Sequence, residues 1–211
     1  MRTTIKICTI IFLLTSILSC KKETPLVSNC GEEYYYYNDQ KIYLYVSRQK
    51  ITVGFYDTMT FQEIQNILDN YTFLKPLNEN LVIHNKKLAI PDLVENLTCN
   101  QINLGLVELK NNSKISYSNS YFMTKNDNYI IGLLGEFIVC LKDTSQVYEL
   151  DSLASATKTI IIKQDKYHPC VYILSANKHS AGNALEMANY FYETGKFEWA
   201  EPNFLLKGIL Y

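Results

Sequence analysis

Apolar and polar residues alternate along 51–56 (ITVGFY), and this alternation predicts a strand with one buried face. Behind it, Thr60 and Glu63 have the spacing of a capping box, and apolar residues follow at helical intervals. A helix is therefore expected to begin at Phe61. Further along, the pattern predicts two strands, a short helix and a last strand, at 81–83, 87–90, 91–99 and 102–109.

The same order of elements, strand–helix–strand–strand–helix–strand, returns in the last third of the chain. The pattern predicts strands at 136–142, 159–163, 170–175 and around Phe197 and Trp199, where Pro202 is expected to end the last one. One helix is expected to be capped at Thr144 or Ser145, and the other at Asn183, with Gly195 as its left-handed C-terminal cap.

Each six-element segment has the order of a ferredoxin-like (βαββαβ) unit. The pattern thus predicts an α+β fold, with two ferredoxin-like units in tandem and flanking β-hairpins. The hairpins are expected at 34–46, turning at Asn38–Asp39, and at 115–134, turning near 125–128. Two helices cover one face of such a sheet, so the other face of each unit is expected to be open.

Four consecutive tyrosines, Tyr34–Tyr37, lie in the first hairpin. One interpretation is an exposed aromatic patch for adhesion or sugar binding. The other is an ordinary strand, with two rings facing the core and two facing solvent.

The first twenty residues have the pattern of an export signal. Arg2 and Lys6 flank the start of an apolar run, 7–18, that is too short for a stable membrane-spanning helix. Residues 17–20 (ILSC) also fit a bacterial lipobox, in which Cys20 carries the lipid; an ordinary signal peptide with an incidental cysteine is the alternative. The expected location is the cell envelope, lipid-anchored to a membrane and facing the periplasm or the exterior.

The expected division of the chain follows from these patterns. It comprises a lipoprotein signal peptide (1–20), a polar tether (21–33), a first ferredoxin-like unit with its hairpins (34–134) and a second such unit (135–211).

Charge and cysteine content exclude several classes of function. The formal net charge is only −1, so no electrostatic footprint for nucleic acid is present. Beyond the signal and Cys20, four cysteines remain without CxxC or histidine spacing, which leaves a metal site unsupported and no cofactor expected. Neighbouring strands should bring Cys140 and Cys170 together, either as a disulfide or as buried free thiols.

Three segments of the last third, GEFIVCLKD, ALEMANYFYETG and FEWAEPNF, resemble the N-terminal prodomain-like region of secreted subtilisin-like (S8 family) serine proteases of Bacteroidetes. YYYYNDQKIYL and KITVGF are similar to the opening of that region. The resemblance covers nearly all of the chain after the signal, and the catalytic domain that follows in the family is not expected here.

The resemblance implies a partner and a mode of binding. Prodomains of this family lay their open sheet face on the protease, thread their C-terminal tail into its cleft, and act as folding chaperones and inhibitors. By similarity, the last strand ends at Phe204, and the tail comprises Leu205, Leu206 and residues up to Tyr211. A C-terminal extension folded back on the core is the alternative for these residues.

No catalytic group is expected. A subtilisin-type triad needs serine, histidine and aspartate, yet none of His84, His168 and His179 lies in a matching motif. Acylphosphatase, another activity of this fold, needs an arginine-bearing phosphate loop. The loops at 57–60 and 143–145 contain no arginine.

Three functions therefore remain open. The first is a membrane-tethered, prodomain-like protein that binds a subtilisin-like serine protease and inhibits it or assists its folding. The second is a truncated remnant of such a protease. The third is a structural or adhesive surface lipoprotein that uses its tyrosine-rich hairpins for contact.

Overall fold

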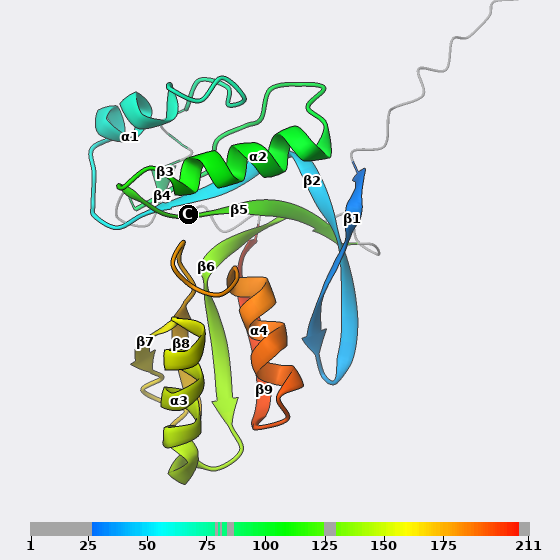
Figure 1. The fold of residues 1–211 in the computed structure, drawn as a ribbon, viewed down its shortest axis with the longest axis vertical. Helices are drawn as coiled ribbons and strands as arrows, with labels where there is room; N and C mark the ends of the chain where they lie inside the picture. The colour runs from blue at the N-terminus through cyan, green and yellow to red at the C-terminus, as the bar shows by residue number, and fades with distance from the viewer. Residues whose placement is uncertain (1–26, 79, 81, 84–86, 125–129, 207–211) are drawn as a thin grey trace, which may run out of the picture.

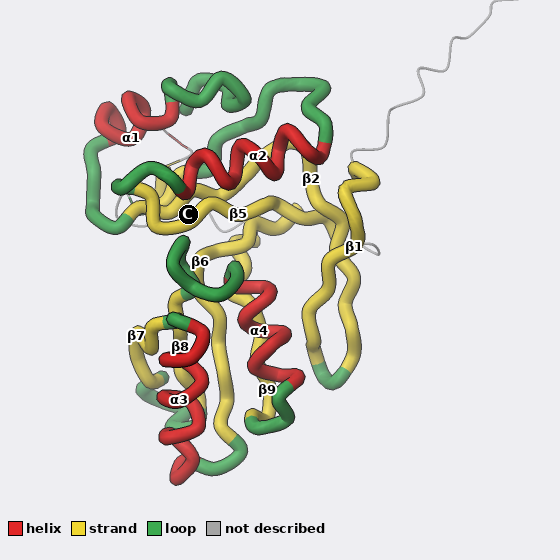
Figure 2. Tube along the Cα trace, in the orientation of Figure 1, coloured by secondary structure: helices red, strands yellow, loops and turns green. Residues whose placement is uncertain are grey.

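A computed structural model describes residues 27–78, 80, 82–83, 87–124 and 130–206. Within these residues the fold is mixed α+β, with one antiparallel nine-stranded sheet and four α-helices (Figures 1 and 2). The elements of the first half are β1 (Val27–Tyr37), β2 (Gln40–Phe55), α1 (Phe61–Leu68), β3 (Val82–Ile83), β4 (Leu88–Ala89), α2 (Cys99–Lys110) and β5 (Ile115–Thr124).

The second half begins with the longest strand of this region. Its elements are β6 (Ile130–Leu141), a 3₁₀ turn (Thr144–Gln146), α3 (Val147–Thr157), β7 (Ile160–Gln164), β8 (Val171–Ser175), α4 (Ala184–Glu193) and β9 (Phe197–Leu206). The sheet order is β3-β4-β2-β5-β6-β8-β7, with β1 added beside β2 and β9 beside β6. The expected boundary at 134/135 falls inside β6, which pairs with β5 at one end and with β8 at the other.

Local signals in the sequence explain two of the helices. Thr60 and Glu63 form the expected capping box at α1, with the Thr60 amide donating to Glu63 Oε2 at 2.7 Å. Asn183 and Glu186 form a second box at α4. Gly195 has the expected left-handed conformation, with φ of +68°. These contacts satisfy backbone groups that the ends of a helix leave free.

The interpretation of 91–109 is wrong. Residues 99–110 form helix α2, capped by Thr98 and Gln101, and no strand occurs at 102–109. Apolar residues alternate there, but Ile102, Gly105 and Leu109 are the buried ones, at helical spacing, whereas Leu104 and Val107 are exposed. The last strand of the first half is therefore β5, taken from the hairpin expected at 115–134.

Several strands also differ from expectation in their extent, and β1 already begins at Val27, within the segment 21–33 expected as a tether. The hairpin strand and the strand at 51–56 are one continuous strand, β2, with an irregularity between Val46 and Ile51. β9 does not end at Pro202 but continues to Leu206. Pro202 lies at a register irregularity opposite Phe137, where a missing N–H is tolerated. The turn at Asn38–Asp39 is as expected, with positive φ at both residues.

Two apolar clusters form the core. One lies between the first half of the sheet and its helices, and includes Ile51, Ile64 and Ile102. The other lies under α3 and α4 but also takes in Leu44 and Phe122 from the first half. The second cluster therefore ties the two halves together, because β2 and β5 contribute to both.

One disulfide joins two cysteines for which no pairing was expected, whereas Cys140 and Cys170 show one of the two outcomes expected for them. Cys30 of β1 and Cys99, the first residue of α2, form a disulfide across 69 residues of sequence. Cys140 and Cys170 are free thiols, brought together as the strand order predicts. The Cys30–Cys99 pairing has no signal in the sequence, because it depends on where the strand β1 lies against α2.

Candidate functional site

The helix-free face of the second half is the candidate site. Phe137 and Val139 of β6 face the helices and lie in the core, so the alternate residues of β6 point to the other side. Strand register then places partners from β8, β7 and β9 on that side. The apolar members of this surface, the open-face patch, are Ile138, Ile160, Ile162, Val171, Ile173 and Trp199.

Exposure of this patch is greatest at the β7 edge. Ile160 is 55 % exposed and Ile162 is 47 % exposed, whereas the other members are half-buried. Figure 1 shows α3 and α4 lying over the opposite face of the same strands. The second half therefore presents apolar sheet surface to solvent, as expected for an open face.

In the first half, the expectation of an open face is wrong. Thr52, on the helix-free side of β2, is completely buried, and its Oγ1 donates to the Leu133 carbonyl of β6 at 2.5 Å. Asn119 of β5 is also buried, and its Nδ2 donates to the Leu134 carbonyl at 3.0 Å. The start of β6 thus covers this face, because the sheet coils where the two halves join.

Aromatic rings and glycines shape that junction. The ring of Tyr117 lies against Gly54 of β2 and Gly135 of β6, where an added Cβ would be 2.0 Å and 2.2 Å from ring atoms. Gly132 leaves room for Tyr121 in the same way. Burial raises the pKa of the Tyr117 hydroxyl. Only glycine lets the rings approach the backbone this closely.

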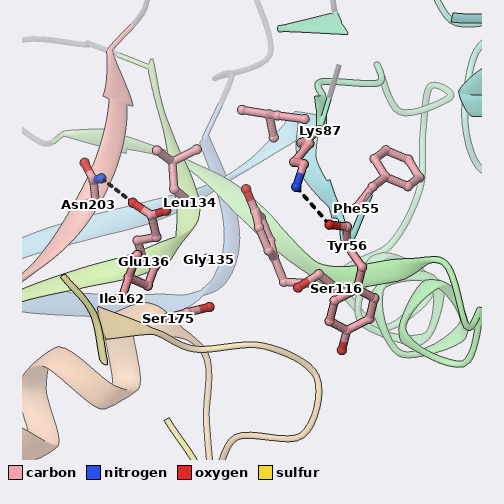
Figure 3. A pocket seen from close by; sticks show the side chains of 12 residues that line it. Phe55, Tyr56, Lys87, Ser116, Leu134, Gly135, Glu136, Ile162, Ser175 and Asn203 are labelled. Carbon is pink, nitrogen blue, oxygen red and sulfur yellow. Dashed lines mark hydrogen bonds between the residues drawn. The ribbon is translucent and has the colours of Figure 1, made fainter. Parts of the chain in front are cut away.

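A cavity of about 470 Å³ opens beside Tyr117, on the helix-free side of the junction. Figure 3 shows Glu136 and Asn203 on one side of it and Lys87 and Tyr56 on the other. Asn203 Nδ2 donates to Glu136 Oε2 at 3.3 Å, and Lys87 Nζ donates to the Tyr56 carbonyl at 3.1 Å. Ile162 of the open-face patch also lines the cavity, so the two surfaces are continuous.

A carboxylate lies within the patch. Glu201 of β9 is opposite Ile138, and burial raises its pKa from the ordinary value of 4.5. Partial burial removes water from around the carboxylate and so disfavours its charged form, which is the cause of the raised pKa.

Three of the residues expected to bind a partner, Phe204, Leu205 and Leu206, lie in the last part of β9. Phe204 is half-buried in β9 and packs edge-on against Tyr35, with ring centroids 5.3 Å apart. Leu205 is half-buried opposite Gly132, and Leu206 pairs with Ile131. The base of the expected tail is therefore the end of a strand. Tyr211 and the lipidation residue Cys20 lie outside the described residues.

The tyrosine run packs against α4 and β9, a placement that the pattern did not predict. The Tyr34 and Tyr36 hydroxyls both donate to Glu193 Oε1 at 3.0 Å. Tyr36 also stacks on Tyr192, with centroids 4.2 Å apart. Tyr37 is the exposed member of the run. The run is thus a strand with intramolecular contacts on both faces.

The histidines form no triad among the described residues. His168 lies in the β7–β8 turn, with Nδ1 3.1 Å from Asp165 Oδ1. His179 is exposed, and the neighbouring Ser180 hydroxyl donates to the Lys158 carbonyl instead. His84 lies outside the described residues.

The described part of the chain shows neither a metal-binding cluster nor a membrane-spanning helix. Its histidine, cysteine and acidic side chains form no cluster of three that could hold a metal ion. None of its helices has the length and apolarity needed to cross a bilayer. A scan of protein-family models and a search of curated proteins both find no match to this chain.

Proposed function

We propose that this protein is a non-catalytic, lipid-anchored envelope protein that binds a subtilisin-like serine protease and inhibits it or assists its folding. In this proposal, Cys20 carries the anchor, and each half of the chain is a ferredoxin-like unit. The orders β5-β2-β4-β3 and β9-β6-β8-β7 support that assignment of the halves. The second half provides the docking surface.

The observation that carries the proposal is the open-face patch. Surfaces of this kind, apolar and contiguous on one face of a sheet, occur where another protein binds. Five of its six apolar members are aliphatic, and Trp199 supplies an aromatic side chain of the type that dominates binding energy in interfaces. Glu201 lies among them, and if it takes up a proton, its further burial under a partner costs little free energy.

The C-terminal segment has a separate role in the proposal. Phe204 packs against Tyr35 two residues before the end of β9, which fixes the last part of this strand on the fold. In this proposal Leu205 and Leu206 stay paired with β6 and lead into the residues up to Tyr211, which bind in the protease cleft as an extended strand. The patch supplies affinity, and the tail blocks the cleft.

Inhibition assays test the proposal directly. Residues 21–211 are added to a panel of subtilisin-like serine proteases, and the turnover of a chromogenic peptide is followed. We expect slower turnover at micromolar concentration or below for at least one enzyme. No effect on turnover or on refolding yield across the panel would remove the proposal and favour the truncated remnant.

A pair of matched variants locates the binding surface. Ile162→Lys places a charge in the patch, where docking would bury it, and should weaken inhibition by roughly tenfold or more. Leu104→Lys is the control, because Leu104 is 60 % exposed on α2, away from the patch. Equal inhibition by both variants would show that the patch is not the binding surface.

Adhesion through the tyrosine-rich hairpin is the second candidate, and Tyr37 and Tyr43 are exposed there. Binding of the protein to glycans or host proteins that is lost in Tyr37→Ala/Tyr43→Ala, without any effect on proteases, would favour it. The contacts of Tyr34 and Tyr36 with α4 leave this surface smaller than the four-residue run suggests.

A further inference from the structure

Two thiols that the proposed function does not use meet inside the second half. Cys140 lies near the end of β6, and Cys170 immediately precedes β8, its neighbour in the sheet. The Leu141 amide donates to the Cys170 carbonyl at 2.8 Å, so the backbones are held in register at this point. The two Sγ atoms are 2.8 Å apart. The strand pairing thus presents a dithiol that needs no chain rearrangement to react.

The two thiols differ in access to solvent. Cys140 is only 5 % exposed, and burial, with a further contribution from the adjacent Cys170, raises its pKa to about 12. Cys170 is half-buried at the strand end. An external reagent therefore meets Cys170 first, and Cys140 can act only on a sulfur already bound next to it.

The rest of the chain indicates the redox conditions. Cys30 and Cys99 are joined in a disulfide, and such bonds persist in compartments where disulfide-bearing oxidants are present. An oxidant able to form that bond across 69 residues also encounters the Cys140–Cys170 pair, whose sulfurs are already in contact.

We propose that Cys140 and Cys170 are a thiol–disulfide exchange site, which a disulfide of a small molecule or a thioredoxin-like protein converts to a second intramolecular disulfide. The Cys170 thiolate attacks one sulfur of the external disulfide, RSSR, and expels RS⁻, which leaves Cys170 bonded to SR. The Cys140 thiolate then attacks Cys170 Sγ and expels the second RS⁻. The two protons lost by the cysteines convert both leaving groups to RSH, so the pair is oxidised and RSSR is reduced.

The second step governs the lifetime of the mixed disulfide. A buried thiol with a raised pKa is rarely ionised, so Cys140 attacks slowly at neutral pH and faster as the pH rises. The Cys30–Cys99 bond already joins β1 to the start of α2, and it is expected to stay formed while the Cys140–Cys170 pair cycles between its two states.

Differential alkylation of the native protein tests the site without any variant. The purified chain is treated with oxidised glutathione, the remaining thiols are alkylated, and peptides are mapped by mass spectrometry. We expect a cross-linked peptide pair containing Cys140 and Cys170, with Cys30–Cys99 unchanged. If both thiols are alkylated in full after prolonged treatment at alkaline pH, the proposal is overturned.

Single variants then separate the two roles. Cys140→Ser should accumulate glutathione on Cys170, because no second thiol resolves the mixed disulfide. Cys170→Ser should react at least about tenfold more slowly, because Cys140 is buried. Faster modification of Cys140 than of Cys170 would reverse the assignment and contradict the proposal.

Fluorescence gives an independent readout. Trp199, the one tryptophan of the chain, lies opposite Cys140 in the β6–β9 register. A disulfide formed beside the indole should quench its emission, reversibly with dithiothreitol, and the bond should raise the melting temperature by roughly 5–10 °C. A native protein whose emission and melting temperature are the same before and after oxidation would count against the site.

Discussion

The two halves of this protein have the same order of elements but different helix-free faces. In the first half, Thr52 and Asn119 on that face are buried beneath the start of β6 and bonded to its carbonyl groups. In the second half, the equivalent face carries exposed Ile160 and Ile162. The second and third strands of each half also differ in length, being two residues long in β3 and β4 and five residues long in β7 and β8.

The difference teaches that an order of elements does not fix which surface is available for binding. The first half uses its helix-free face to attach the second half, so its polar residues there are structural. Among the described residues, no further strand covers the helix-free face of the second half. Apolar residues exposed there are available for a partner, and this is why the proposed function rests on the second half alone.

The largest difference in stability is expected between two variants that place the same positive charge on the helix-free face of the first half and on that of the second half. Thr52→Lys should destabilise the protein by more than about 4 kcal/mol, because Thr52 is completely buried and an ammonium group there has no counter-charge. Ile162→Lys should change the free energy of unfolding by no more than about 0.5 kcal/mol. Urea unfolding of both variants measures the difference. Similar losses in the two variants would remove the distinction between the faces.

Removal of the Cys30–Cys99 disulfide should cost about 4 kcal/mol, because the bond closes a loop of about 70 residues in the unfolded chain. The bond joins β1, which packs on the second half, to the start of α2 in the first. The double variant Cys30→Ser/Cys99→Ser should therefore lower the melting temperature of the whole protein in one transition. Trp199 fluorescence and far-UV circular dichroism can monitor the melting. If the two probes show separate transitions, the two halves are joined less tightly than the shared apolar cluster indicates.

An added methyl group at the junction of the two halves should lower the stability of the protein moderately. Gly135→Ala places a Cβ 2.2 Å from the Tyr117 ring, which is also held against Gly54. The expected loss is about 1–3 kcal/mol, from displacement of the ring. In a Tyr117→Leu background the same substitution should cost clearly less, and an equal cost in both backgrounds would show that the ring is not the obstacle.

The smallest effect on stability is expected from Glu201, the half-buried carboxylate of the patch. Burial raises the pKa of Glu201 in the folded state, so between 4.5 and that higher value the folded protein holds more protons than the unfolded chain. Stability therefore falls as the pH rises through this interval. Glu201→Gln should reduce this fall and make the protein slightly more stable at pH 7, as a pH series of thermal melts can measure. A steeper fall in the variant would contradict the sign.

Helices with side-chain caps could be predicted from the sequence. The boxes at Thr60–Glu63 and Asn183–Glu186 act within one turn, so their geometry depends on local chain alone. The helices α3 and α4 and the strands β7 and β8 of the second half were predicted with small errors at their ends for the same reason, since alternation and caps agree there. The adjacency of Cys140 and Cys170 also followed, because it needs only the strand order.

Helix α2 and the end of β9 were missed for identifiable reasons. Leu104 and Leu106 alternate like strand residues, and this pattern concealed the box formed by Thr98 and Gln101. Pro202 lacks an amide hydrogen, but the register irregularity opposite Phe137 removes the need for one. Whether that irregularity exists depends on β6, which is distant in sequence.

The sequence by itself determined most of the elements, their βαββαβ order and the alternation that gives most strands an apolar and a polar side. These depend on neighbours within a few residues. Only the tertiary structure decided that β6 covers the face of the first half, that Tyr34 and Tyr36 turn to Glu193, and that Cys30 joins Cys99. Those contacts link segments far apart in the chain, and they form because apolar surfaces of both halves are buried together around β2, β5 and β6.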